Sequence, residues 1–196
     1  MDFRTSVETV PQEQEAPSRG GAKPLLREIL ETILLTALIF YAVNFTTGRF
    51  RIDGDSMEPS MHDGQYVIIS KLSYRLGDPD RGDVIVFRYP RGPERDFIKR
   101  IIGLPGDTVE VRDGVVLVNG VPLEEDYIAS PPAYENTWKV GDGEYFVLGD
   151  NRNNSSDSHT WGMLPAGNVI GRAWIKYWPP TDWGLVPHES LAVASP

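Results

Sequence analysis

The feature that most constrains the fold is an apolar segment near the N-terminus, LLREILETILLTALIFYAVNF at residues 25–45. The run from residue 29 to residue 45 is interrupted only by Glu31, Thr32, Thr36 and Asn44. As a helix this run rises about 26 Å, and the preceding Leu25 and Leu26 extend it to the roughly 30 Å of a bilayer core. Since proline suits the first turn of a helix, Pro24 is a suitable start. We therefore expect one transmembrane helix at residues 24–45.

Two alternatives remain for this segment: an amphipathic helix on a membrane surface, or a signal peptide that is cleaved. No clear small-x-small site follows the run, which disfavours cleavage. Basic residues precede the segment and also follow it, at Arg49 and Arg51, so charge scarcely indicates its orientation. Residues 1–23 are polar and lack hydrophobic periodicity, and we expect them to form a disordered tail.

Beyond residue 45 the pattern changes to short apolar runs separated by turn signals. The predicted strands are residues 66–71, 84–89, 97–104, 144–148 and 169–178, and residues 108–123 contain further alternating runs. Asp113-Gly114 and Asn119-Gly120 separate those alternating runs, which predicts two consecutive hairpins. Residues 124–134 read as a loop, and the chain from Pro179 reads as an irregular tail. Because no strand–helix–strand alternation appears, residues 46–196 predict one antiparallel all-β domain.

Composition excludes several classes of function. The net charge of −9 is unfavourable for binding nucleic acid, which requires Lys and Arg to contact phosphates. The absence of cysteine excludes disulfides, Cys-ligated zinc and a thiol nucleophile. His62, His159 and His188 lie far apart without metal-ligand spacing, so no metal or other cofactor is predicted.

Ser56 is the first candidate for chemistry. It lies in GDSMEP, residues 54–59, soon after the apolar segment. A serine in such a turn is usually structural, and its hydroxyl is a weak nucleophile that needs a nearby base. Histidine bases occur in several chain orders, so a histidine partner stays open.

Lys99 is the second candidate, within DFIKRIIGLPGD at residues 96–107. If this strand alternates strictly, Lys99 shares a face with Phe97 and Ile101. Burial would lower the lysine pKa, and a neutral lysine accepts a proton from serine in Ser-Lys hydrolases. From spacing alone, the commoner outcome is a lysine that reaches solvent or pairs with a carboxylate.

A polar stretch, GDNRNNSSDSHTWGMLP at residues 149–165, is the third candidate. Asp150, Asn151, Ser155 and Asp157 could hydrogen-bond one another and a nearby lysine. The alternative is a solvated loop with Asx turns.

Taken in order, these segments resemble the characteristic sequence motifs, called boxes, of type I signal peptidases. The matching boxes are GDSMEPSM (54–61), YVIISKLSYR (66–75), RGDVIVF (81–87) with FIKRIIGLPGD (97–107), and GDNRNNSSDSHTWG (149–162). The resemblance covers about residues 25–178. Each box alone is only moderately specific, but four in order are highly specific.

The resemblance implies roles for particular residues. Ser56 matches the nucleophile and Lys99 the general base. Ser155 matches a serine that positions the lysine by hydrogen bonding, and Asp157 matches a carboxylate in a supporting polar network. In the family a turn shapes this end of the site, and the residues that match it are Gly149, Asp150 and Asn151.

The resemblance also implies a substrate and a location. The family prefers small residues at the first and third positions before the cut. The residues that match the walls of its shallow apolar pockets are Phe50, Ile52, Met57 and Ile98, for which plain core packing is the alternative. The implied fold is an all-β catalytic core with an additional β subdomain. The implied location is the plasma membrane, which the chain crosses once, with the catalytic domain on the outer face. Its partners would be signal peptides of secretory preproteins and membrane lipid.

Three positions depart from the family pattern. His159 stands where many bacterial members have arginine, so a salt bridge from Asp157 would depend on histidine protonation. Asn153 stands where many have aspartate. Gly54 stands where some members have a serine that helps the oxyanion hole, which here would rest on backbone N–H groups, chiefly that of Ser56.

Two other functions remain to be distinguished. A self-cleaving repressor type of Ser-Lys peptidase would have a DNA-binding or partner domain at the N-terminus, where this chain has a tail and an apolar segment. A membrane-tethered β domain that only binds partners would keep the fold without the chemistry. The presence of Ser56, Lys99, Ser155 and Asp157 together argues against the second.

Overall fold

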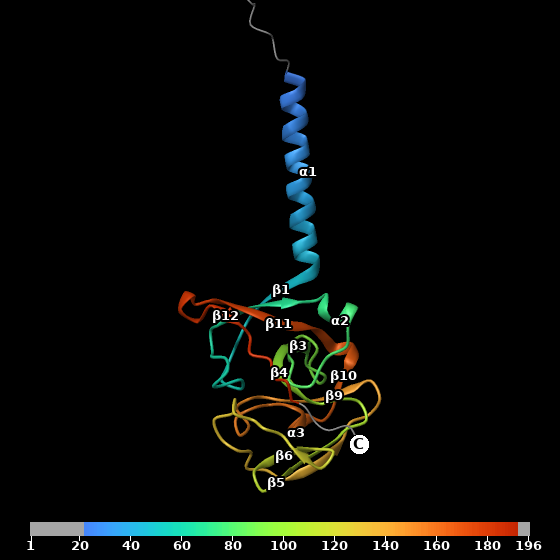
Figure 1. Cartoon of the computed structure of the whole chain (residues 1–196), viewed down its shortest axis with the longest axis vertical. Coiled ribbons are helices and arrows are strands. Elements are labelled where there is room, and N and C mark those ends of the chain that lie inside the picture. The colour runs from blue at the N-terminus through green and yellow to red at the C-terminus, as the bar shows by residue number, and fades with distance from the viewer. Residues whose placement is uncertain (1–21, 192–196) are drawn as a thin grey trace, which may run out of the picture. The chain divides into compact units, whose positions relative to one another are not determined.

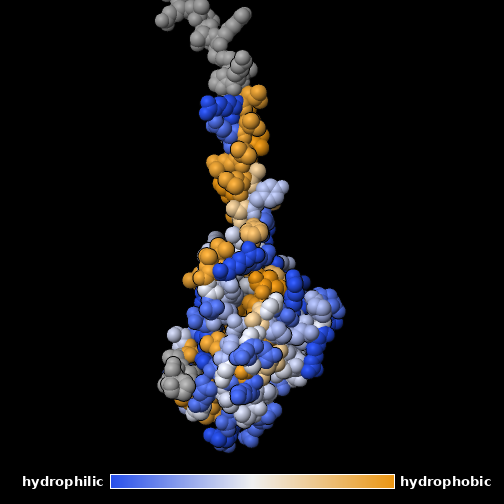
Figure 2. Space-filling view, turned by 90° about the vertical axis from the view of Figure 1, so that its right-hand side faces the viewer, coloured by the Kyte–Doolittle hydropathy of each residue, from blue (hydrophilic) through white to orange (hydrophobic). Residues whose placement is uncertain are grey.

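The computed structural model describes residues 22–191. The predicted tail therefore falls almost entirely outside the described residues. The first element is the helix α1 (Ala22–Thr46), which begins two residues before the predicted start at Pro24. Its stretch Leu25–Thr46 contains 18 consecutive residues with a mean hydropathy of 1.8, and none of these 18 is buried against protein. Figure 2 shows apolar side chains exposed along it. By length and composition this helix can cross a membrane.

The chain divides into two compact units, residues 1–41 and residues 42–196. Across the described part of the second unit, the strands form two antiparallel sheets (Figure 1). The larger sheet has the order β1-β2-β11-β3-β4-β9-β10, with β12 paired to β11. Its strands are β1 (Thr47–Arg51), β2 (Tyr66–Ser70), β3 (Val84–Arg88), β4 (Asp96–Gly103), β9 (Glu144–Leu148), β10 (Leu164–Pro165), β11 (Val169–Trp178) and β12 (Gly184–Leu185).

The smaller sheet has the order β7-β6-β5-β8. Its strands are β5 (Thr108–Arg112), β6 (Val115–Val118), β7 (Val121–Pro122) and β8 (Asn136–Lys139). The short helical elements of the second unit are α2 (Ser73–Leu76), α3 (Ser158–Trp161), η1 (Ala166–Asn168) and η2 (Pro180–Asp182). The all-β prediction, with an additional β subdomain, is confirmed.

The two hairpin predictions are confirmed as well. Asp113 and Gly114 connect β5 to β6 with φ angles of 51° and 74°, and Asn119 and Gly120 connect β6 to β7 with 53° and 81°. Positive φ at both central residues is what a two-residue hairpin of matching twist requires, and Asn or Asp followed by Gly adopts it at low cost.

β4 is the strand that joins the parts of the core. Ile98 packs against one buried cluster around Met57 and Val86. Ile101 belongs to a second cluster, and Ile102 belongs to the third, which fills the smaller sheet. Because both faces of β4 are covered, the polar side chains between these isoleucines are buried too.

The segment after Pro179 differs from the predicted irregular tail. β12 pairs with β11, and Val186 is 3% exposed within the core. Arg100 donates to the carbonyl of Pro187 at 3.0 Å. Strand pairing and one buried valine therefore hold this segment against the domain. Its apolar pattern is too short for the sequence to predict this.

Candidate active site

Ser56 lies in a turn that two backbone contacts hold against the loop after β9. The carbonyl of Ser56 accepts the N–H of Asn151 at 3.1 Å, and the Asn151 side chain donates to the carbonyl of Asp55 at 3.0 Å. Gly54 enters this turn at φ 88°, where its N–H donates to Asp63 at 2.7 Å. The turn is thereby fixed at both ends, and the Ser56 side chain is left half-buried.

Lys99 reaches Ser56 from β4. Its Nζ lies 2.7 Å from Ser56 Oγ and donates to the carbonyl of Ile98 at 2.7 Å. The residue is only 4% exposed, so it does not extend into solvent. Burial lowers the pKa of Lys99 to about 8, while the carboxylates of Asp157 and Asp150 act in the opposite direction. A lysine with this pKa holds a large fraction of neutral amine at mildly alkaline pH.

The loop 149–157 forms the floor behind this pair. Gly149 donates its N–H to Asp157 Oδ2 at 2.9 Å. A Cβ at Gly149 would overlap the Ser56 carbonyl oxygen and the Ser155 hydroxyl, so only glycine permits this close approach. The Ser155 hydroxyl is buried and has no hydrogen-bond partner within residues 22–191. Its role in positioning Lys99 stays a prediction.

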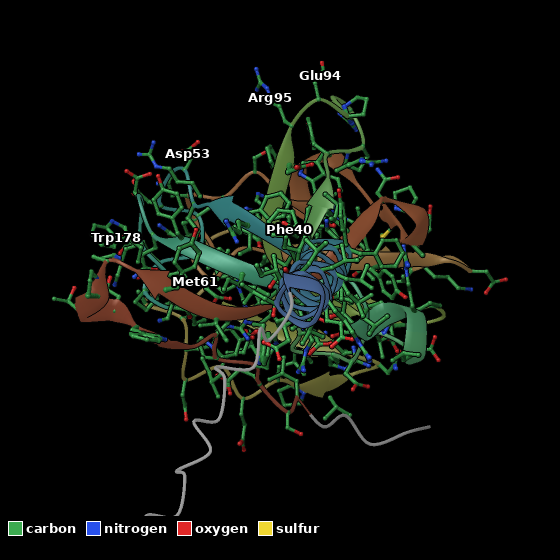
Figure 3. All side chains as sticks on the ribbon, turned by 90° about the horizontal axis from the view of Figure 1, so that it is seen from above. Phe40, Asp53, Met61, Glu94, Arg95 and Trp178 are labelled. Atoms are coloured by element: carbon green, nitrogen blue, oxygen red, sulfur yellow. The ribbon has the colours of Figure 1, made fainter. Side chains whose placement is uncertain are left out.

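A cavity of about 550 Å³ opens beside Ser56 and Lys99. Of the predicted pocket residues, Phe50, Ile52 and Ile98 line it, whereas Met57 is fully buried in the core and does not. The other lining residues are Arg51, Asp53, Val67, Val86, Arg95, Asp96, Phe97 and Ser156. Asp53 and Arg95 lie toward the outside of the molecule in Figure 3. The charged lining residues other than Lys99 are exposed, whereas Ile52, Val67 and Val86 are buried.

Open backbone edges border the same cavity. β1 is one of the edge strands of the larger sheet. In β4, residues 96–99 pair with β3 on one side, while the pairing with β9 begins only at Arg100. An extended peptide can therefore add to either edge by backbone hydrogen bonds.

Two buried ion pairs brace the site, and sequence reasoning missed both. Arg100 pairs with Asp150, and Arg152 donates to both oxygens of Glu125 at 2.7 and 2.6 Å. The ring of Tyr127 lies 4.3 Å from the Arg100 guanidinium. Glu125 and Tyr127 belong to the segment predicted only as a loop. No local sequence signal marks these partners, because each pair joins segments distant in the chain.

Comparison with known proteins identifies the family. The family model described as signal peptidase, peptidase S26, matches residues 26–178, a range that contains Ser56, Lys99 and Asp157. The chain belongs to this signal peptidase family. It is a serine peptidase and hence a hydrolase.

Two similar proteins carry the same family name. The chain is 44% identical over 170 residues to a probable signal peptidase I-2 of Synechocystis, covering 83% of this chain and 78% of that protein. It is 43% identical over 180 residues to a signal peptidase I of Leptolyngbya laminosa, covering 86% and 88%. A crystal structure of a signal peptidase I from Enterococcus faecalis has 38% identity and a TM-score of 0.46, covering 49% of this chain and 97% of that one.

Proposed function

We propose that this peptidase is a membrane-bound endopeptidase that removes N-terminal signal peptides from exported preproteins, with Ser56 as nucleophile and Lys99 as general base. The observation that carries the proposal is the 2.7 Å separation of Lys99 Nζ and Ser56 Oγ. The lysine is only 4% exposed, and burial favours a neutral amine over an ammonium.

The chemistry proceeds in two steps. Ser56 Oγ attacks the scissile carbonyl carbon as its proton moves to Lys99 Nζ. The C–N bond then breaks, the amine leaves with that proton, and an ester to Ser56 remains. Water attacks this ester and gives a proton to Lys99, which returns it to Ser56 Oγ as the signal peptide leaves.

The oxyanion of each intermediate needs N–H donors. Within residues 22–191 the N–H of Ser56 donates to no protein acceptor, so it is available for this purpose. Asn151 fixes the turn from which this N–H projects. Such a preorganised donor stabilises the transition state more than the ground state.

The cavity supports a preference for small residues before the cut. Phe50, Ile52 and Ile98 are apolar and line a shared cavity beside the dyad. A substrate added to β1 or β4 as an extended strand would direct alternate side chains into it. That alternation matches small residues at the first and third positions.

We further propose that α1 anchors the enzyme in the plasma membrane, with the catalytic domain on the outer face. Its length and mean hydropathy support a single span. External protease added to intact cells should then cleave the catalytic domain. Full protection until the membrane is permeabilised would contradict this orientation.

The proposed function is tested with the full-length protein in detergent and a secretory precursor carrying an Ala-x-Ala site. Wild type should cut once, directly after the second alanine, and Ser56→Ala should not cut. Ser60→Ala, a change in the same turn, is the matched control and should cut normally. An intact precursor with folded wild type would instead favour a domain that binds partners without cleaving them.

A further inference from the structure

His159 is held against the carboxylate of Asp157. Its Nδ1 lies 2.6 Å from Asp157 Oδ1, and its backbone N–H donates to the same oxygen at 3.1 Å. The Asp157 side chain is fully buried and the His159 side chain is 18% exposed. Since an ionised carboxylate only accepts hydrogen bonds, Nδ1 carries a proton in this arrangement.

The other ring nitrogen is where a second proton would bind. Across the described chain, His159 Nε2 makes no hydrogen bond. The imidazole stacks on the ring of Tyr134, with centroids 4.1 Å apart and planes inclined by 6°. The stacking fixes the ring in one orientation while partial exposure leaves it access to water. Histidine is the side chain whose charge ordinarily changes between pH 5 and 8.

The other charged groups near the Asp157–His159 pair are already neutralised, so the charge of Asp157 depends on His159 for its balance. Asp150 is neutralised by Arg100, and Arg152, whose charge acts on Tyr134, is neutralised by Glu125. Among residues 22–191, His159 is the one side chain within ion-pair distance of Asp157. The buried charge of Asp157 is therefore balanced only by His159 and, at longer range, by Lys99.

Asp157 in turn acts on the dyad by two routes. Its Oδ2 holds the N–H of Gly149, which packs directly against the Ser56 carbonyl and the Ser155 hydroxyl. Its negative charge also favours the protonated form of Lys99. A proton on His159 would cancel that charge and so favour the neutral lysine.

We propose that His159 is a positioning residue that holds Asp157 and transmits its own protonation state to the Lys99 base. This inference rests on the proposed function of the Ser56/Lys99 pair. Protonated His159 allows Lys99 to stay neutral at lower pH, so activity falls less steeply on acidification than a single titrating lysine would allow. Neutral His159 leaves Asp157 to stabilise the lysine cation.

Two substitutions separate these states. His159→Arg supplies a permanent cation beside Asp157, and His159→Gln keeps a neutral donor. We expect the acid limb of kcat/KM for cleavage of an Ala-x-Ala precursor to move about one pH unit lower in His159→Arg. In His159→Gln the limb should become steeper without moving downward. His62→Arg is the matched control, because His62 forms a similar pair with Glu58 but is 53% exposed.

Several outcomes would overturn the inference while leaving the proposed function intact. Superimposable pH profiles of kcat/KM for wild type and His159→Arg would show that the Asp157–His159 pair does not affect the protonation of Lys99. Equal losses of activity at every pH in both variants would indicate a purely structural role. Absence of cleavage by wild type would instead overturn the proposed function itself.

A second measurement does not depend on activity or on folding of the His159 variants. NMR of imidazole-labelled full-length protein follows the titration of the His159 ring in wild type and in Lys99→Met. Coupling is reciprocal, so removing the Lys99 cation should raise the pH at which His159 titrates. An unchanged midpoint in Lys99→Met would contradict the coupling.

Discussion

Arg100 and Asp150 form a bidentate ion pair in which both side chains are fully buried. Arg100 Nε and Nη2 donate to Asp150 Oδ1 and Oδ2 at 2.8 and 2.7 Å. Arg100 follows Lys99 on β4, and Asp150 lies between Gly149 and Asn151 in the loop behind Ser56. The pair therefore ties the strand of the base to the loop that supports the nucleophile.

Arg100→Met should destabilise the fold by about 3–5 kcal/mol, because Asp150 is left as a buried charge without its partner. Chemical denaturation of the detergent-solubilised protein measures this loss. Arg112→Gln is the control, since Arg112 pairs with Glu110 at 3.0 Å but is 58% exposed, and should cost less than about 1 kcal/mol. Equal stability of Arg100→Met and wild type would show that the Arg100–Asp150 pair does not stabilise the fold.

Gly149→Ala should lower kcat/KM by about 100-fold or more. The added methyl group meets the backbone carbonyl of Ser56, which cannot move without displacing the nucleophile. Gly167→Ala, where nothing lies within 4 Å of the new Cβ, should leave cleavage unchanged. Cleavage kinetics of the two purified variants test this prediction. Normal turnover by Gly149→Ala would mean that the loop moves to accommodate the methyl group without displacing Ser56.

Lys99→Met should make the protein more stable near neutral pH although it abolishes activity. Burial lowers the pKa of Lys99 from 10.5 to about 8, so holding the ammonium in the folded state below pH 8 costs about 3 kcal/mol. Between pH 8 and 10.5 the unfolded state binds the extra proton, and wild-type stability rises with pH.

The advantage of Lys99→Met should accordingly shrink over that pH window and vanish above it. Thermal unfolding of wild type and Lys99→Met between pH 6.5 and 11 measures the difference. A constant offset at all pH values would mean that Lys99 is not held in a medium that disfavours its charge.

Local signals made much of this fold predictable. Asp113-Gly114 and Asn119-Gly120 are read correctly because the turn requires positive φ at those positions. Runs such as VIVFR, which became β3, carry their own β-branched and apolar signal. By contrast β1 (TGRFR) and β8 (NTWK) are polar and short, and pairing with neighbours rather than composition makes them strands.

The site was less accessible from sequence for a related reason. From spacing alone, Lys99 was more easily explained as a lysine reaching solvent. Its burial follows from the packing of β4 between three clusters, which no window around Lys99 reveals. The Arg100–Asp150 and Arg152–Glu125 pairs join residues 50 and 27 positions apart, so only the tertiary fold brings them together.

The most direct test of the Ser56/Lys99 dyad is the pH dependence of cleavage by wild type and Lys99→Arg. Lys99→Arg keeps the positive charge but cannot supply a neutral base in the working pH range. Wild-type kcat/KM should rise with pH to a plateau with a midpoint near pH 8, and Lys99→Arg should be inactive at every pH while remaining folded. Near-normal cleavage by folded Lys99→Arg would contradict the assignment of Lys99 as the base.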